Sequence, residues 1–124
     1  MSRLHFYDGA ASAAESELAA VLEPARALFR ELIIERIMAF EAYRRLAETS
    51  ESPQLEMVKV ADIAHKIAGV GATLGFTRTG QLASALDRSI TENPAKFADP
   101  EYLRRVVDPL LETLLVEMEA LLDD

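Results

Sequence analysis

The longest apolar pattern in the sequence lies near its C-terminal end, and it constrains the fold most. Leucine, valine and methionine recur there every three or four residues from Leu103 to Leu122. This spacing places them on one face of an α-helix, whereas a strand would alternate apolar and polar residues. Asp99 and Pro100 provide a start for this helix. Pro109 removes a backbone hydrogen bond inside it, so we expect a kink or a restart there.

The same spacing recurs in four further segments, and no segment alternates like a strand. The four segments are residues 12–22, Pro24 to about Glu48, about Gln54 to Leu74, and Thr77 to about Ile90. Residues 1–11 lack the pattern and are predicted to be a flexible leader. We therefore expect an all-α protein in which residues 12–124 form an antiparallel four-helix bundle with a short extra N-terminal helix.

Small and cyclic residues mark the ends of the predicted helices. Ser52 and Pro53 fit a cap and a first helical position before the helix at Gln54. Gly75 suits a left-handed C-terminal cap, and Thr77 can cap the helix that follows. Because the turn at Gly75 is so short, the two helices beside it are predicted to form an antiparallel hairpin.

Composition excludes several classes of function. The chain has 124 residues, enough for one domain with a core, and it contains no cysteine for disulfides or thiol chemistry. Its net charge of −8 opposes binding to nucleic acid and to anionic membranes. No apolar run approaches the roughly 18 residues that span a bilayer. We expect a soluble, cytoplasmic monomer, with a dimer contact through extra apolar residues such as Ile34 and Met38 as the less favoured alternative.

One histidine lies in the middle of the predicted helix over Gln54–Leu74. Its helical face is predicted to carry small or short side chains and to point away from the core; these are Ala61, Asp62, Ala68, Gly69 and Ala72 around His65. The opposite face is an apolar stripe predicted to enter the core, made of Val60, Ile63, Ile67, Val70 and Leu74. A glycine one turn after His65 weakens the helix by roughly 1 kcal/mol, which suits close approach by another molecule.

Elimination narrows the chemistry open to His65. A nucleophilic triad needs a serine or cysteine at a suitable turn, and none is present. Asp62 and His65 have the spacing of half a di-iron motif, but His5 is the only other histidine and lacks a partner, so we expect no metal. An exposed imidazole is largely unprotonated at neutral pH and can itself attack phosphorus. Phosphoryl transfer is mostly positioning and charge neutralisation, so a partner can supply the metal and the cations.

The segment around His65 resembles the histidine-containing phosphotransfer (HPt) family. The family signature places a histidine before an apolar residue, a glycine, small residues and a second glycine. The matching residues are His65, Ile67, Gly69, Ala72, Leu74 and Gly75, followed on the next helix by Leu82, Ala83 and Leu86. The motif covers about residues 61 to 87, and the predicted helices are similar to the family's bundle over nearly the whole chain.

The resemblance implies a role in bacterial two-component signal transduction. His65 would accept a phosphoryl group from the aspartate of a response-regulator receiver domain and pass it to another receiver, with a hybrid histidine kinase as a further possible partner. Gly69 would give the receiver clearance, and Asp87 would orient the imidazole. Mg²⁺ would be needed only on the receiver, and no cofactor or ATP-dependent kinase activity is implied for this chain.

This sequence departs from the family at one position. Many members place a lysine three residues after the histidine, where this chain has Ala68. Lys66 is the nearest cation for the phosphoryl group, and Arg78 and Arg88 are weaker candidates. Two alternatives stay open: a helical module that binds a receiver or kinase without accepting phosphate, and a metal- or cofactor-binding bundle disfavoured by its few ligands.

Overall fold

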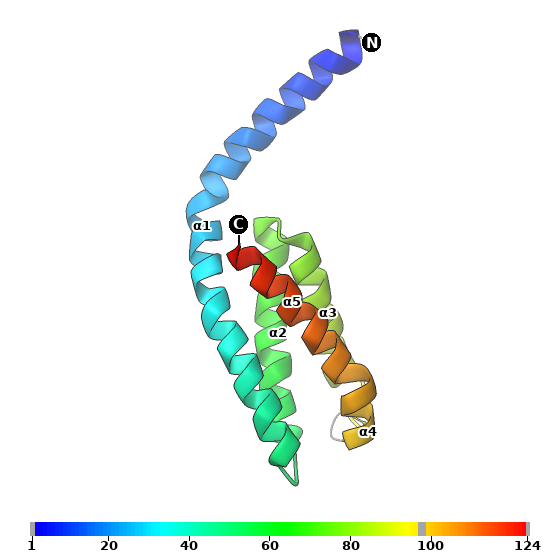
Figure 1. The fold of residues 1–124 in the computed structure, drawn as a ribbon. Helices are drawn as coiled ribbons and strands as arrows, with labels where there is room; N and C mark the ends of the chain where they lie inside the picture. Colours follow the sequence, from blue (N-terminus) through cyan, green and yellow to red (C-terminus); the bar gives the residue numbers. More distant parts are fainter. Residues whose placement is uncertain (1, 97–98, 124) are drawn as a thin grey trace.

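The computed structural model describes residues 2–96 and 99–123, with side chains from residue 13 onward, and these ranges are helical without a β-strand (Figure 1). The elements are α1 (Ser2–Thr49), α2 (Gln54–Leu74), α3 (Thr77–Thr91), α4 (Pro100–Tyr102), the π-helical turn η1 (Leu103–Val107) and α5 (Asp108–Leu122). The short elements α4 and η1 run directly into α5. The described ranges thus form four helical rods, and the predicted all-α class is confirmed.

The N-terminal part of the chain differs from the sequence prediction. A single helix, α1, runs through residues 2–11 of the predicted leader, the short helix at residues 12–22 and the helix from Pro24 onward, so over the described residues the N-terminal segment is continuous with the next helix. Proline removes one backbone hydrogen bond, here to the carbonyl of Ala20. Because Ala20 and Pro24 are both exposed, water can bind that carbonyl and the helix continues. Whether residues 1–11 are flexible stays a prediction.

One hydrophobic core joins the four rods. Its most deeply buried members come from every rod and include Ile33, Phe40, Val60, Leu86, Val107, Leu111, Leu114 and Met118. The most extensive contact joins α2 and α3. The predicted apolar stripe of α2 is buried with one exception: Val70 is 45% exposed, because it lines an open hollow between α1 and α2.

The turn between α2 and α3 fixes how these two helices pack. Gly75 has φ +86°, the left-handed cap predicted from the sequence. Its neighbour Phe76 donates a backbone N–H to the carbonyl of Gly71 at 2.8 Å, which closes the end of α2. Arg26 of α1 donates its Nε–H to the carbonyl of Leu74 at 2.7 Å, so α1 is attached to the same turn.

Two of the predicted N-terminal caps are wrong. Pro53 occupies the cap position of α2 and Phe76 that of α3, and neither cap involves a side-chain hydrogen bond. Ser52 therefore lies one residue before the cap of α2, and Thr77 is already the first residue of α3.

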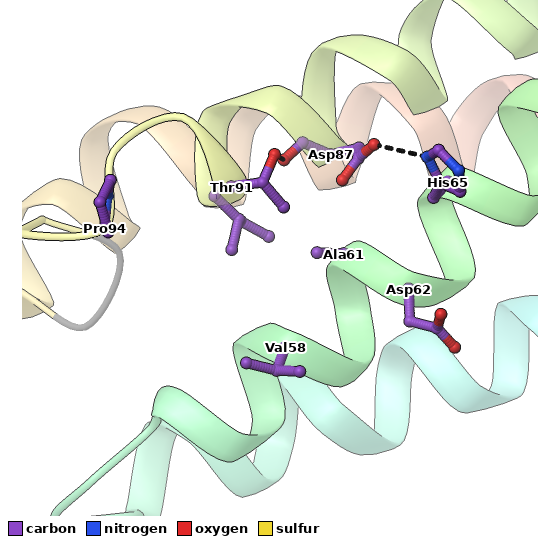
Figure 2. A pocket seen from close by; sticks show the side chains of 8 residues that line it. Val58, Ala61, Asp62, His65, Asp87, Thr91 and Pro94 are labelled. Atoms are coloured by element: carbon purple, nitrogen blue, oxygen red, sulfur yellow. Dashed lines mark hydrogen bonds and ion pairs between the residues drawn. The ribbon is translucent and has the colours of Figure 1, made fainter.

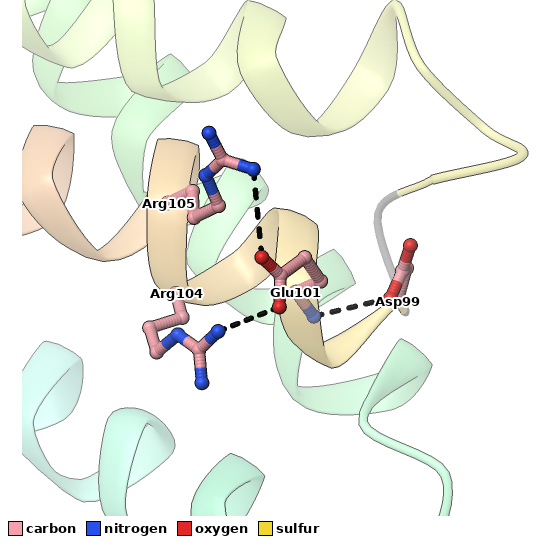
Figure 3. Close-up of polar contacts among 4 residues, drawn as sticks. All are labelled: Asp99, Glu101, Arg104 and Arg105. Carbon is pink, nitrogen blue, oxygen red and sulfur yellow. Dashed lines mark hydrogen bonds and ion pairs between the residues drawn. The ribbon is translucent and has the colours of Figure 1, made fainter.

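The C-terminal rod begins with a network of polar contacts (Figure 3). Asp99 accepts a hydrogen bond from the backbone N–H of Glu101 at 3.1 Å and caps α4 as predicted. Glu101 in turn pairs with Arg104 at 2.6 Å and with Arg105 at 3.5 Å. The π-helical turn follows and runs without a break into α5, whose second residue is Pro109, so the irregularity expected near this proline is a local change of helix type and not a new start. The wider turn accommodates a residue that cannot donate its backbone nitrogen.

An ion pair connects the C-terminal rod to α1. Arg44 of α1 and Glu112 of α5 approach within 2.7 Å. Burial raises the pKa of the nearby Asp108 carboxyl above its ordinary value, while Arg44 opposes this shift. No helix among the described residues has the length and apolar character needed to cross a membrane.

Candidate functional site

His65 projects from the middle of α2 into solvent, with its side chain 78% exposed. Its Nδ1 lies 3.0 Å from Oδ2 of Asp87 on α3, whose side chain is only 17% exposed. Figure 2 shows the two side chains pointing toward each other across the gap between the helices. The structure therefore brings together two residues that are 22 positions apart and that the sequence analysis had assigned to one site.

The contact between His65 and Asp87 fixes the hydrogen bonding of the imidazole. An ionised carboxylate can only accept hydrogen bonds, so Nδ1 is the donor. In the neutral ring Nε2 then holds the free lone pair. The hydrogen bonds found among the described side chains include none at Nε2. Nε2 is thus the nitrogen able to act as a nucleophile.

A close crossing of α2 and α3 brings Asp87 within reach of His65. A Cβ atom built on Gly71 would lie 3.3 Å from the backbone nitrogen of Gly80, and one built on Gly80 would lie 3.2 Å from that of Ala72. Both values are tighter than ordinary van der Waals contact. Only residues without a side chain let the two backbones approach this closely. The sequence analysis missed this packing role of Gly71 and Gly80.

The residues around His65 match the predicted small-residue face in part. Gly69, Ala72 and Asp62 are exposed, and Ala68 is half-buried. A Cβ atom built on Gly69 would meet no described atom within 4 Å, so the space beside His65 is open there. The prediction is wrong for Ala61, which is 5% exposed. It lies one turn before His65 on the side of α2 that α3 covers.

Lys66 does not approach the imidazole nitrogens in this structure. Its Nζ lies 3.1 Å from Oδ2 of Asp62, one turn earlier on α2, and both side chains are 58% exposed. Exposed ion pairs of this kind contribute about 0.5 kcal/mol, so the lysine is free to exchange partners. Arg78, a weaker candidate, pairs with Glu117 of α5 at 3.3 Å.

Three shallow hollows meet at His65. One lies between α2 and the end of α3 and is lined by Val58, Ala61, Asp62, His65, Asp87, Ile90, Thr91 and Pro94 (Figure 2). A second lies between α1 and α2 and is almost entirely apolar, with Leu28, Leu32 and Val70 among its lining residues. A third lies over the α2–α3 crossing and contains Gln81, Ser84 and Arg88.

The sequence analysis missed several residues of these hollows. Leu28 and Leu32 have the three- and four-residue spacing of an apolar helix face, yet both are exposed in the hollow between α1 and α2. The sequence analysis gave no role to Gln81 or Ser84 of α3. Helical spacing shows which residues share a face of one helix, but it does not show where the faces of two helices meet.

Within the part of the chain that the structure describes, no group of three or more His, Asp or Glu side chains is placed to hold a metal ion. Comparison with models of protein families, with curated proteins and with solved structures finds no match for this chain. The residues at the site therefore carry the functional argument on their own.

Proposed function

We propose that the protein is a phosphoryl carrier of the HPt type, with His65 as the phosphoacceptor and a receiver-domain aspartyl phosphate as the donor. The observation that carries the proposal is the exposed imidazole whose Nδ1 is bound to Asp87 at 3.0 Å. This arrangement leaves Nε2 with a free lone pair directed away from Asp87. We also propose that the four rods are antiparallel to one another. The short turn between α2 and α3 supports this arrangement.

The transfer is a displacement at phosphorus. The Nε2 lone pair of His65 attacks the phosphorus of the aspartyl phosphate, a P–N bond forms, and the P–O bond to the aspartate breaks. The electron pair of that bond leaves on the receiver's carboxylate. As Nε2 acquires the phosphoryl group the ring gains positive charge, which the Asp87 carboxylate stabilises through Nδ1–H. Transfer to a second receiver is the reverse displacement.

The surface near His65 supports the approach of a folded domain. The phosphorus of the donor's aspartyl phosphate must come within about 3–3.5 Å of Nε2 of His65 for an in-line displacement. Gly69 and Ala72 add no bulk on the exposed face after His65. The α2 side of the apolar hollow, where Val70 is 45% exposed beside Gly69, offers surface that a receiver can bury. We assign the partner-binding role to Asp62, Ala68, Gly69 and Ala72.

A helical module that binds a receiver without accepting phosphate is the second candidate. The pairing of Lys66 with Asp62 favours it, because it leaves no lysine directed at His65. In the carrier, Lys66 leaves Asp62 to meet the phosphoryl group, or the receiver supplies the cation. The half-buried Asp87 carboxylate aimed at Nδ1 is the observation that this candidate leaves unexplained.

The test is phosphotransfer from purified receiver domains of the source organism, each phosphorylated by radiolabelled acetyl phosphate in the presence of Mg²⁺. A carrier acquires acid-labile, base-stable label, and His65→Gln abolishes it. His5→Gln is the matched control, because it removes the only other histidine and is expected to leave labelling unchanged. Tight receiver binding without label on His65 would establish the binding module instead.

A further inference from the structure

The N-terminal part of α1 extends beyond the bundle as a separate arm (Figure 1). We use the term arm for α1 from Ser2 to Val21. Among its described side chains all are exposed except Ala19, which is half-buried, and Leu22 is the first residue of α1 to pack against the core. A helix of this length without tertiary packing is marginal in water, so the arm lacks a source of stability within its own chain.

One set of apolar residues recurs with a seven-residue period along the arm and into the part of α1 that follows it. Leu18 and Val21 are 58% and 75% exposed, and Ala14, Ala25 and Leu28 are exposed at the same alternating steps of three and four residues. In the sequence the steps continue backwards through Ala11, Tyr7 and Leu4. The complete set, with a and d positions alternating, is Leu4, Tyr7, Ala11, Ala14, Leu18, Val21, Ala25 and Leu28.

Such a repeat is typical of helices that supercoil around another helix. A straight α-helix has 3.6 residues per turn, so a seven-residue period that persists over several turns drifts across its surface unless the helix supercoils. A single amphipathic helix on a globular core shows a wider, less regular stripe. The set defined above therefore indicates a coiled-coil seam, and nothing in the bundle covers the described part of it.

We propose that a second copy of this chain covers the seam, so that two arms form a parallel, in-register coiled coil from Leu4 to Leu28. Identical a and d positions then meet, and each seam residue packs against its own counterpart. The acidic residues Glu15, Glu17 and Glu23 on the same stretch disfavour a nucleic acid or an anionic membrane as the occupant. This dimer replaces the monomer expected from the sequence.

The charges beside the seam favour the parallel orientation. In a parallel pair each g residue faces the e residue five positions later on the partner chain. Glu17 then faces Leu22, and Glu15 faces Ala10, so no two acids meet. An antiparallel pair overlapping from Leu4 to Leu28 centres on Ser16 and brings Glu15 against Glu15 and Glu17 against Glu17. Like charges at these positions are destabilising.

The first test measures the mass of the full chain in solution by sedimentation over a wide range of concentration. We expect twice the mass of one chain, and Leu18→Glu raises the dissociation constant by about 100-fold or more because two leucines leave the seam. Ile34→Glu is the matched control: Ile34 is 52% exposed on α1 but lies off the seam, so its variant stays dimeric. Helical content measured by circular dichroism shows that each variant is folded.

The second test determines orientation. Because the chain has no cysteine, a single Val21→Cys introduces the only thiol. In the parallel pair the two Cys side chains meet within disulfide distance, and mild oxidation yields a covalent dimer. Ala20→Cys, on the exposed opposite side, is the control and stays largely uncrosslinked. A wild-type monomer, or a four-chain assembly, overturns the two-chain coiled coil, and a dimer that Val21→Cys does not crosslink overturns the parallel register.

Discussion

Two glycines on α2 lie two residues apart and have opposite surroundings. Gly69 is exposed, and a Cβ atom there would meet no described atom within 4 Å. Gly71 is buried, and a Cβ atom there would lie 3.3 Å from the backbone nitrogen of Gly80. The packing of α3 therefore explains Gly71, whereas nothing inside the protein explains Gly69. A helix keeps a residue that weakens it by about 1 kcal/mol more readily where something outside needs the space.

The different surroundings of Gly69 and Gly71 indicate that the two faces of α2 have different roles. The face toward α3 sets the distance between the helices and so brings Asp87 to His65. The outward face around Gly69 keeps the exposed imidazole accessible. Substitutions at the two glycines are therefore expected to affect different measurements: stability at Gly71 and phosphotransfer at Gly69.

The largest effect is expected from Gly71→Leu. The added side chain meets the backbone of Gly80, which cannot move aside as a flexible side chain would. We expect a loss of about 3 kcal/mol in the free energy of unfolding, measured by urea denaturation. As α3 is displaced, the contact between Asp87 and His65 is lost as well. Unchanged stability would show that the two helices do not cross as closely as described.

Gly69→Leu is the matched variant on the outward face. Its side chain has open space, so the protein stays folded and is expected to gain about 1 kcal/mol of stability from helix propensity. Transfer from a phosphorylated receiver is expected to fall about 100-fold, because the bulk beside His65 keeps the donor from its productive distance. Labelling of His65 by the small donor phosphoramidate is the control and stays near wild type. A folded variant with normal receiver transfer would contradict the clearance role of Gly69.

The sequence was sufficient for the helical class because apolar spacing reports which face of each helix is buried. Val60, Ile63 and Ile67 enter the core as predicted, and the left-handed cap at Gly75 follows from the conformational freedom of glycine. The break at Pro24 was wrong for a physical reason. A proline inside a helix is tolerated where the carbonyl that it leaves unpaired faces water, and local sequence does not report that exposure.

The site was predictable only as far as one helix determines it. The outward direction of His65 follows from helical periodicity. The burial of Ala61 and the exposure of Val70 do not, because both depend on how closely α3 and α1 cover α2. The pairing of Asp87 with His65 came from the family resemblance, and no spacing within either helix indicates that their side chains meet. The narrow crossing at Gly71 and Gly80 is the element that made the pairing possible.

Asp87→Ala tests how much the Asp87 carboxylate on α3 contributes to phosphotransfer at the exposed His65. Removing the carboxylate deletes a hydrogen bond to a group that becomes charged, which contributes about 1.5 kcal/mol, so transfer to His65 is expected to slow about tenfold. Receiver binding should be unchanged because the Asp87 side chain is mostly buried. NMR of the imidazole nitrogens is expected to show that the ring no longer keeps a single tautomer with its proton on Nδ1. An unchanged rate and spectrum would remove Asp87 from the site.

Gly69→Ala and Gly71→Ala are expected to have the smallest effects. They give the most direct comparison of the two positions, because each adds a single methyl group. Both substitutions remove the same helix penalty of about 1 kcal/mol. At Gly69 the methyl group meets open space, so the full gain in the free energy of unfolding is expected and transfer stays within a few-fold of wild type. At Gly71 the methyl group presses on the backbone of Gly80, and the strain offsets or exceeds the gain. Denaturation of the two variants side by side should therefore separate them by about 1 kcal/mol or more, with Gly69→Ala the more stable. Equal stabilisation at both positions would mean that α3 yields to a methyl group at no cost, and the crossing would then no longer explain why His65 and Asp87 stay in contact.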